Sequence, residues 1–307
     1  MKLITSPDFV REDRTPVVLA LGSFDGLHRG HQKIINKTIA LAQQDNLCSG
    51  VYSFYPHPLK IIAHKPTPPR LITEERKIEK LRELGVDYYF QQKFTQDFSE
   101  IPFENFIKDI LVNKINVRHV VVGQDFRFGH QGQGNVNLLQ EYGAKYGFEV
   151  TALPAFKIEG RKVSSSYIRK LVHKGQVKEI PKYLGEYYKI TGRVVHGHGR
   201  GRKLGFPTAN LNLLTNYALP KPGVYAGYTY FKGQKYKSVT NYGDNPTFSN
   251  SDFTIEIHIL GLTGDIYDCK VTFEFIDFIR KEEKYNDVDQ LKEQIYKDIL
   301  YTREILC

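Results

Sequence analysis

Residues 22–31 read Gly-Ser-Phe-Asp-Gly-Leu-His-Arg-Gly-His, and this stretch decides how the first half of the chain folds. It follows the apolar run Val17–Leu21, which predicts a buried strand. It precedes a segment in which the residues of the apolar side recur at helical spacing, which predicts an amphipathic helix. These residues are Ile34, Ile35, Thr38, Ile39, Leu41 and Ala42. A strand, a glycine-rich turn and a helix in this order direct backbone N–H groups and a positive dipole end at the turn. A phosphate group suits that position.

Two histidines lie at the start of the predicted helix. His28 and His31 are three residues apart, which places them on one helical face. Two imidazoles beside a helix N-terminus can stabilise charge that grows on a phosphate chain during a reaction. The spacing alone fits equally well a structural turn with two solvated histidines, so both interpretations stay open at this point.

Length and composition exclude several classes of protein. The 307 residues suffice for two domains, and 41% hydrophobic with 13% aromatic residues predicts folded cores. No apolar run approaches the roughly 20 residues of a membrane span, and the first residues lack the apolar core of a secretory signal. Cys48, Cys269 and Cys307 are far apart without metal-ligand spacing, which favours ordinary thiols in a reducing cytoplasm.

The net charge of +9 predicts anionic ligands. Nucleic acids are one such class, and nucleotides with other phosphorylated small molecules are another. The charge does not choose between them.

Strands and helices alternate through the rest of the first half. Further strands are predicted at 51–54, 86–90, 117–122 and 148–153, and helices begin after Thr73, at Pro102 and at Asn135. This alternation predicts an α/β domain with a parallel sheet and right-handed crossovers. The loops 22–31 and 123–129 both follow strand ends, so we expect them to face one ligand crevice.

Three more segments of the first half are candidates for binding. Tyr55-Pro-His57-Pro is a stiff loop, and Asp125-Phe-Arg-Phe follows a buried strand; each also fits a plain turn. Residues 163–169, Val-Ser-Ser-Ser-Tyr-Ile-Arg, open a short helix. Serines at a helix start are usually N-caps, but with Arg169 they can also clamp a phosphate.

The pattern changes near residue 180. Pro181–Gly185 reads as a short linker, which predicts domains at 1–183 and 184–307. Strand-like segments then follow at 188–195, 224–231, 235–242, 253–260 and 271–279. Without long helices between them, they predict an antiparallel barrel or sandwich. A final helix is predicted over about 288–306, with Val288, Leu291, Ile295 and Ile299 as its packing stripe.

The stretch Gly199-Arg-Gly-Arg-Lys203 allows two interpretations. Read alone it suggests an RNA-binding tail, but it lies between strands and is not repeated, which favours a phosphate-cradling loop. His196 and His198 lack further metal ligands nearby and read as exposed loop residues. Glu256 alternates with two isoleucines, which is the ordinary pattern of a solvent-facing strand position.

The motifs of the first half resemble one family. Residues 22–31 resemble the G-x-F-D-G-x-H-x-G-H form of the nucleotidyltransferase H-x-G-H signature found in prokaryotic FAD synthetases. Residues 54–58, 123–129 and 164–169 resemble that family's F-x-P-H-P, V-G-x-D-F-x-F-G and S-S-T-x-I-R segments. Ser166 stands where the family has threonine, and Tyr167 where arginine is frequent.

The second half resembles riboflavin kinases. Residues 200–210 resemble R-G-R-x-L-G-F-P-T-A-N, and 222–226 and 241–248 resemble P-G-V-Y-A and N-I-G-x-x-P-T-F. Residues 255–260 resemble the strand that carries the catalytic glutamate, and Gly261 stands where aspartate is frequent. The chain therefore resembles the bifunctional riboflavin kinase/FMN adenylyltransferase family over about residues 15–306.

This resemblance implies a Rossmann-like N-terminal domain with a parallel sheet and a C-terminal antiparallel β-barrel with a terminal helix. It also implies the site residues. The catalytic residues would be His28, His31 and Glu256, and the Mg2+ ligands Thr208 and Asn210. The ATP contacts would include both histidines together with Gly22, Phe24, Asp25, Gly26, Gly30, Ser164, Ser165, Arg169, Gly201 and Arg202. The flavin contacts would be His57, Asp125, Phe126 and Arg127.

The implied function is a two-step transferase. It would phosphorylate riboflavin to FMN with ATP, then adenylylate FMN to FAD with release of pyrophosphate, using Mg2+. The implied partners are riboflavin, FMN and ATP in the cytoplasm, without nucleic acid or membrane; self-association is left open. One alternative is that only one of the two activities is retained. The other is a nucleic-acid-binding protein that uses the positive charge and the Arg-Gly stretch.

Overall fold

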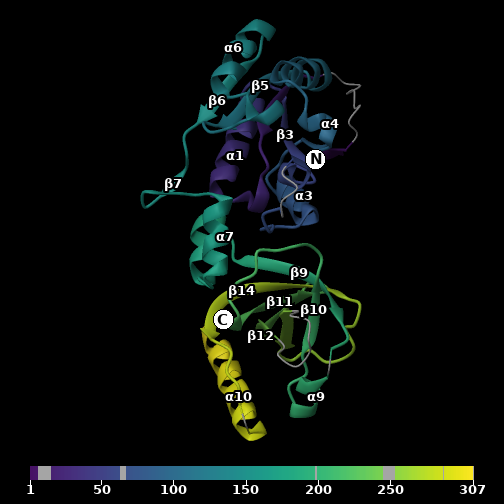
Figure 1. Cartoon of the computed structure of the whole chain (residues 1–307), viewed down its shortest axis with the longest axis vertical. Coiled ribbons are helices and arrows are strands. Elements are labelled where there is room, and N and C mark those ends of the chain that lie inside the picture. The colour runs from purple at the N-terminus through teal and green to yellow at the C-terminus, as the bar shows by residue number, and fades with distance from the viewer. Residues whose placement is uncertain (6–14, 63–66, 198, 245–252, 286, 307) are drawn as a thin grey trace. The chain divides into compact units, whose positions relative to one another are not determined.

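A computed structural model describes residues 1–5, 15–62, 67–197, 199–244, 253–285 and 287–306. The chain forms two compact units (Figure 1). The first unit comprises Met1–Pro68 and Glu74–Ser164, and the second comprises Pro69–Thr73 and Ser165–Cys307. Residues 165–183 thus group with the second unit, whereas the predicted division between the two functions after residue 183 stays a prediction.

The first unit is built on a six-stranded parallel sheet with the strand order β1-β4-β3-β2-β5-β6. The strands are β1 (Lys2–Ile4), β2 (Val17–Leu21), β3 (Cys48–Tyr55), β4 (Tyr88–Lys93), β5 (Val117–Gly123) and β6 (Glu149–Leu153). The predicted α/β fold is therefore confirmed. The edge strand β1 was not predicted, because three residues are too few to show a period.

Helices and turns cover this sheet. They are η1 (Asp25–Leu27), α1 (Arg29–Gln44), α2 (Pro58–Ile62), α3 (Glu74–Glu83), α4 (Gln96–Ser99), α5 (Phe103–Asn105), the π-helical η2 (Phe106–Ile115), η3 (His130–Gly132) and α6 (Val136–Tyr146). A small hairpin, β7 (Lys157–Ile158) with β8 (Arg161–Lys162), follows β6.

Strand β2 is buried on both faces, as a central parallel strand must be. Val17, Leu19 and Leu21 belong to the same buried cluster as η2. Val18 and Ala20 point the other way, into clusters that contain side chains of α1. This sandwiching holds the end of β2, where the glycine-rich turn begins, in a fixed place.

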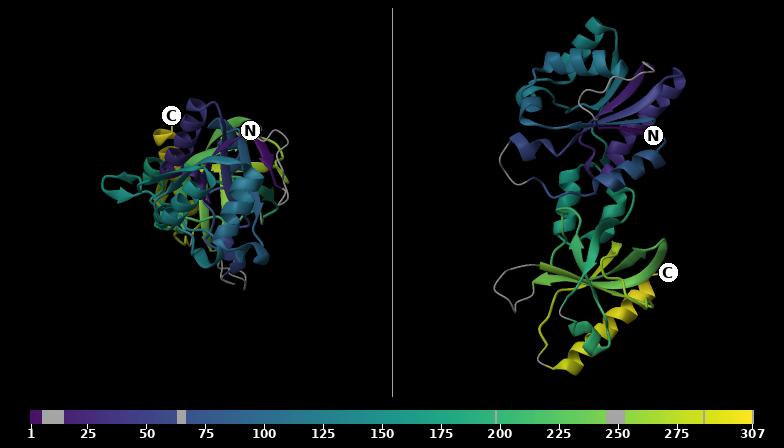
Figure 2. Two further views of the ribbon diagram at one scale, coloured as in Figure 1. Left: turned by 90° about the horizontal axis from the view of Figure 1, so that it is seen from above. Right: turned by 90° about the vertical axis from the view of Figure 1, so that its right-hand side faces the viewer.

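The second unit is a closed antiparallel barrel with the order β10-β13-β12-β11-β14-β9, which Figure 2 shows in green and yellow. Its strands are β9 (Tyr188–Val195), β10 (Ala209–Leu213), β11 (Gly223–Phe231), β12 (Gln234–Asp244), β13 (Phe253–Ile259) and β14 (Lys270–Arg280). The expected barrel is confirmed. Pairing of β9 with β10 closes it, and β10 was missing from the strands that we predicted.

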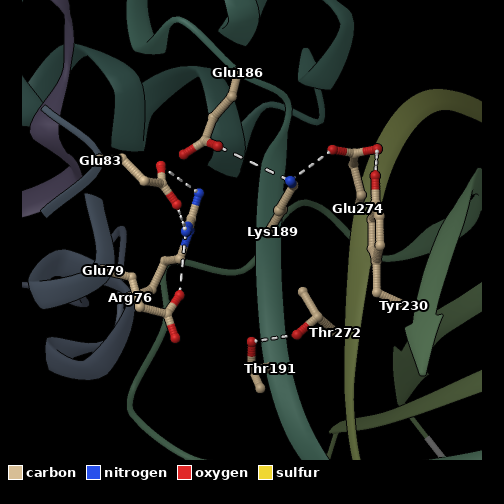
Figure 3. A network of polar contacts seen from close by, with 9 residues as sticks. All are labelled: Arg76, Glu79, Glu83, Glu186, Lys189, Thr191, Tyr230, Thr272 and Glu274. Atoms are coloured by element: carbon tan, nitrogen blue, oxygen red, sulfur yellow. Dashed lines mark hydrogen bonds and ion pairs between the residues drawn. The ribbon is translucent and has the colours of Figure 1, made fainter. Parts of the chain in front are cut away.

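A polar network connects three strands of the barrel wall (Figure 3). Lys189 of β9 lies 3.1 Å from Glu274 of β14, whose other oxygen accepts a bond from the Tyr230 hydroxyl of β11 at 2.9 Å. Glu186 lies 3.9 Å from the same lysine. These contacts pair the buried Glu274 carboxylate with a cation, which limits the cost of burying it.

The helices of the second unit are α7 (Ser165–His173), η4 (Val177–Glu179), α8 (Ile180–Leu184), α9 (Arg200–Leu204) and α10 (Val288–Ile305). Two sequence predictions were wrong here. The expected linker Pro181–Gly185 is largely helix α8, because Ile180, Tyr183 and Leu184 are buried and stabilise it. The expected loop 199–203 is mostly helix α9, flanked by Gly199 and Gly205 in left-handed conformations.

The terminal helix α10 lies along the barrel (Figure 2). Ile295 and Ile299 pack with Val224 and Val239 of the barrel wall. Val288, which we predicted in the packing stripe, is 54% exposed and does not belong to it, because the helix begins beyond the barrel contact. Among the described residues, none of the helices combines the length and the apolar character that a membrane crossing needs.

Candidate active sites

The first candidate site lies where β2 ends. The chain turns through Phe24 and Leu27 with φ of 51° and 46°, and through Gly26 with φ of 82°. Such values suit glycine and strain other residues. The Phe24 ring is fully buried, so packing holds this strained turn in place. The turn then delivers His28 to the start of α1.

The structure brings His28 and His31 together. Their rings stack with centroids 3.5 Å apart, and the N–H of His31 donates to Nδ1 of His28 at 3.2 Å. His28 is therefore the N-cap of α1, with its Nδ1 as the acceptor. A Cβ at Gly30 would lie 3.2 Å from two atoms of the His28 ring, so glycine keeps this approach open.

His31 is uncharged in this arrangement. Burial lowers the pKa of His31 well below its usual value, and the charges of His28 and Lys77 lower it further. Its Nδ1 is buried and has no hydrogen-bond partner among the described residues. His31 thus offers the hydrogen-bonding groups of a neutral imidazole rather than a positive charge.

Three predicted binding loops follow three neighbouring strands. The loop with His57 follows β3, the glycine-rich turn follows β2, and the loop with Asp125 follows β5, and these strands are adjacent and parallel. Their carboxyl ends therefore meet at one edge, as expected for a ligand crevice. The predicted ATP contacts Gly22, Phe24, Asp25 and Gly26 and the predicted flavin contacts belong to these loops, and Gly30 lies in the first turn of α1.

Two of the predicted flavin contacts already have partners in the protein. Asp125 pairs with Lys162 of β8, and this hydrogen bond lowers the pKa of the carboxyl. Phe126 stacks on Phe128 with centroids 5.7 Å apart, while Arg127 is exposed. Their role with flavin stays a prediction.

The predicted phosphate clamp divides between the units. Ser164 closes the first unit, and Ser165 and Arg169 lie in α7 of the second. Nε of Arg169 donates to the carbonyl of Pro69 at 2.7 Å. The clamp itself stays a prediction.

The second candidate site lies on the barrel. Asn210 of β10 and Asn241 of β12 both lie directly opposite Glu256 of β13, one on each side. Opposed residues of neighbouring strands point to the same face of a sheet. The Thr208 hydroxyl, just before β10, donates to Oε2 of Glu256 at 3.2 Å. The structure therefore brings together the three residues predicted for catalysis and metal binding in this half.

Thr208, Asn241 and Glu256 line a cavity of about 320 Å³, a size suited to a small molecule. Its walls come from the barrel, from α9 and from α10. Gly201 lines it, and a Cβ there would collide with the Phe206 carbonyl and crowd Thr208. Arg202, also predicted to contact ATP, is exposed and does not line the cavity.

Comparison with known proteins identifies the family of each half. Residues 10–167 match the FAD synthetase family, and residues 184–306 match the riboflavin kinase family. The bifunctional riboflavin kinase/FMN adenylyltransferases of Buchnera aphidicola subsp. Schizaphis graminum and Bacillus subtilis are 35% and 36% identical to this chain. They cover 97% and 96% of it with 97% and 94% of their own lengths. The chain belongs to the bifunctional riboflavin kinase/FMN adenylyltransferase family.

One solved structure shares the fold of this family member over its length. A crystal structure described as a macrolide-efflux protein from Streptococcus pneumoniae aligns with a TM-score of 0.89 at 31% sequence identity, covering 99% of both chains. The efflux in that description refers to the other protein.

The sequence analysis did not single out two residues that line the barrel cavity, Asn241 and Arg280. Asn241 donates from Nδ2 to Oε1 of Glu282 at 2.8 Å, while its Oδ1 is buried and unpartnered among the described residues. Arg280 lies opposite Val224, which in turn lies opposite Asn241, so it extends the row that contains Glu256. Asn241 belongs to the motif at residues 241–248, but only the strand register shows that it lies on the same face as Glu256.

Arg280 also attaches the terminal helix to the barrel. Its Nε lies 3.0 Å and its second terminal nitrogen 2.8 Å from the two oxygens of Asp298, which is 3% exposed. We expect Asp298→Ala to destabilise this attachment by about 3 kcal/mol, because it leaves a largely buried guanidinium unpaired. Hydrogen exchange of the α10 amides should become at least about tenfold faster.

Glu293→Ala is the matched control for this prediction. It removes an exposed pair with Lys297 on the same helix and should leave exchange unchanged. Equal exchange rates in both variants would show that the Arg280–Asp298 pair does not hold the helix.

Proposed function

We propose that the second unit phosphorylates riboflavin to FMN and that the first unit adenylylates FMN to FAD, with ATP as the donor in both steps. The observation that supports this most strongly is that each unit assembles its own set of functional residues. In the barrel, Thr208 and Glu256 line a cavity and Asn210 lies opposite Glu256, and in the first unit His28 stacks on His31 where β2 ends. The riboflavin kinase match from residue 184 supports the division after residue 183.

In the kinase step, Glu256 takes the proton of the terminal ribityl hydroxyl. The oxygen attacks the γ-phosphorus of ATP, the bond from this phosphorus to the bridging oxygen breaks, and ADP leaves. Such a transfer depends mainly on positioning and on neutralising charge. The hydroxyl of Thr208 holds the Glu256 carboxylate in place. The cavity beside Glu256 is the place that we propose for the flavin and the phosphates.

Thr208 and Asn210 are the residues that we propose for Mg2+. Both supply oxygen donors, which this hard cation prefers. A Cβ at Gly197 would collide with the Asn210 amide, so glycine leaves room for that side chain. When bound, the ion neutralises phosphate charge. Mg2+ is commonly bound by a few protein oxygens together with substrate phosphates and water.

In the adenylyl transfer, a phosphate oxygen of FMN attacks the α-phosphorus of ATP. The bond from that phosphorus to the bridging oxygen breaks, and pyrophosphate leaves. The nucleophile is already an anion, so no strong base is required. We propose that His28 and His31 donate hydrogen bonds to the phosphates, together with the N-terminal N–H groups of α1. Ser164, Ser165 and Arg169 would hold the leaving phosphates, and His57 with Asp125–Arg127 the flavin.

The remaining partner predictions belong to this proposal as well. They are a cytoplasmic enzyme acting on riboflavin, FMN and ATP without nucleic acid or membrane. The bacterial relatives named above, which are riboflavin kinase/FMN adenylyltransferases, support the choice of substrates.

Analysis of the products tests the proposal directly. The pure protein is incubated with ATP and Mg2+, once with riboflavin and once with FMN, and the flavins are separated by chromatography. We expect FMN and then FAD from riboflavin, and FAD from supplied FMN. FMN as the only product from riboflavin would mean that the first unit is silent, with Tyr167 the first position to examine. FAD only from supplied FMN would implicate the second unit and Gly261, and no product from folded protein would overturn the enzyme assignment.

A further inference from the structure

A buried lysine contacts the backbone of the glycine-rich turn. Lys77 of α3 is 1% exposed, and its Nζ lies 3.1 Å from Oε2 of Glu74. The same ammonium donates to the carbonyl of Ser23, inside the turn, at 3.4 Å. A charge removed from water in this way is costly unless it is paired and hydrogen-bonded. Its bond to the Ser23 carbonyl therefore connects this buried charge to the turn that carries the site.

The contacts of Lys77 are part of a larger network. The Ser23 carbonyl also accepts a bond from the Ser53 hydroxyl of β3 at 3.1 Å. The other oxygen of Glu74 accepts bonds from Tyr89 at 2.6 Å and Gln91 at 2.8 Å, both in β4. Hydrogen bonds from α3 and β3 therefore fix the Ser23 carbonyl, and bonds from β4 fix Glu74, the partner of Lys77. This peptide directly precedes Phe24, the strained residue of the turn.

The same lysine acts electrostatically on His31. The groups whose charge lowers the pKa of His31, after burial, are His28 from the start of α1 and Lys77 from α3, and Glu74 stands behind Lys77 as its counter-ion. A phosphate chain bound at the turn would therefore be attracted by the positive charge of Lys77 and could accept a hydrogen bond from the uncharged ring of His31.

We infer that Lys77 is a positioning residue for the adenylyl transfer: it holds the Ser23 peptide in place and maintains a positive charge next to His31. The inference rests on the proposed role of His28 and His31. It adds a residue that contacts no substrate itself and acts through the turn and through His31.

Lys77→Met tests the inference, because it removes the charge and keeps an unbranched side chain. FAD formation from FMN should fall by about tenfold to a hundredfold in kcat/KM as the turn loses its support. FMN formation from riboflavin by the same protein should stay unchanged. The NMR titration midpoint of the His31 ring should move up, because a like charge has been removed. A loss of packing alone would not move this midpoint in that direction.

Arg76→Met is the matched control. Arg76 is the neighbouring cation of α3, but it forms exposed pairs with Glu79 at 3.1 Å and Glu83 at 2.7 Å (Figure 3). Both activities and the His31 midpoint should stay as in the unaltered protein. Lys77→Arg keeps the charge and should keep the midpoint.

The outcomes separate this inference from the proposed function. Unchanged FAD formation and an unchanged His31 midpoint in Lys77→Met would overturn the inference and leave the proposed function standing. Unchanged FAD formation in His31→Gln would instead overturn the role of the histidine. If Lys77→Met does not fold, Glu74→Gln takes its place: it leaves the lysine without its counter-ion and should lower the His31 midpoint. No movement in that variant would overturn the inference.

Discussion

Replacing Glu256 by glutamine is expected to stop FMN formation from riboflavin and to leave FAD formation from supplied FMN unchanged. A positioned general base contributes about 10²- to 10⁴-fold to a rate, and the amide cannot accept the ribityl proton. The amide oxygen of glutamine can still accept the bond from Thr208, so the barrel should keep its structure. Glu256→Ala should have the same effect on activity. Rates of FMN and FAD production, measured by chromatography on one preparation, check this prediction.

The control for Glu256 is Glu293→Gln. Glu293 is an exposed glutamate of α10 that pairs with Lys297 and does not line the cavity. It should leave both rates unchanged. If Glu256→Gln retained FMN formation, or lost both activities while folded, the base would not be Glu256 or the two activities would not be divided as proposed.

The double variant His28→Ala with His31→Ala is expected to abolish FAD formation and to leave FMN formation intact. Removing one donor to a developing phosphate or carbonyl charge costs about 10²- to 10³-fold, so the loss of both should bring the rate below detection. The measurement is the pair of product analyses with riboflavin and with FMN. Loss of both activities in a folded double variant would contradict the division of labour.

His28 has a structural role that the experiment must separate from catalysis. It caps α1, and loss of an N-cap costs about 1 kcal/mol of stability. Asparagine is a good N-cap without an imidazole, so His28→Asn should restore the stability of the helix but not the FAD activity. If His28→Asn were as active as the unaltered protein, the contribution of His28 would be structural only.

Local sequence patterns determined the architecture of each half. The apolar run Val17–Leu21, the turn after it and the 3.6-residue period of α1 predicted a parallel α/β unit. Alternation in segments such as Lys270–Arg280 predicted the antiparallel barrel. Such patterns are readable because a buried face repeats with the period of its own strand or helix. The motifs with His28, His31, Thr208, Asn210 and Glu256 also led to the family that the comparisons confirm.

These patterns did not correctly predict the short helices or the start of the packing stripe on α10. Pro181–Gly185 carries linker residues, yet burial of Ile180 and Leu184 makes helix α8 of it. Residues 200–204 form α9 despite their glycine and charge content, and Val288 lies on the predicted stripe but beyond the barrel. For α8, tertiary packing outweighs local preference, and the position of Val288 depends on where the barrel ends rather than on the period of the helix.

Only the tertiary structure decided how the functional groups combine. The row Asn210–Glu256–Asn241 depends on the register of three strands, and the Arg280–Asp298 pair joins a strand to a helix. The low pKa of His31 arises from burial, from the stacked His28 and from Lys77, which lies 46 positions further along the sequence. Sequence patterns describe which residues share a face of one element. They do not describe the distances between elements, and those distances set the charge and the orientation of the groups in both sites.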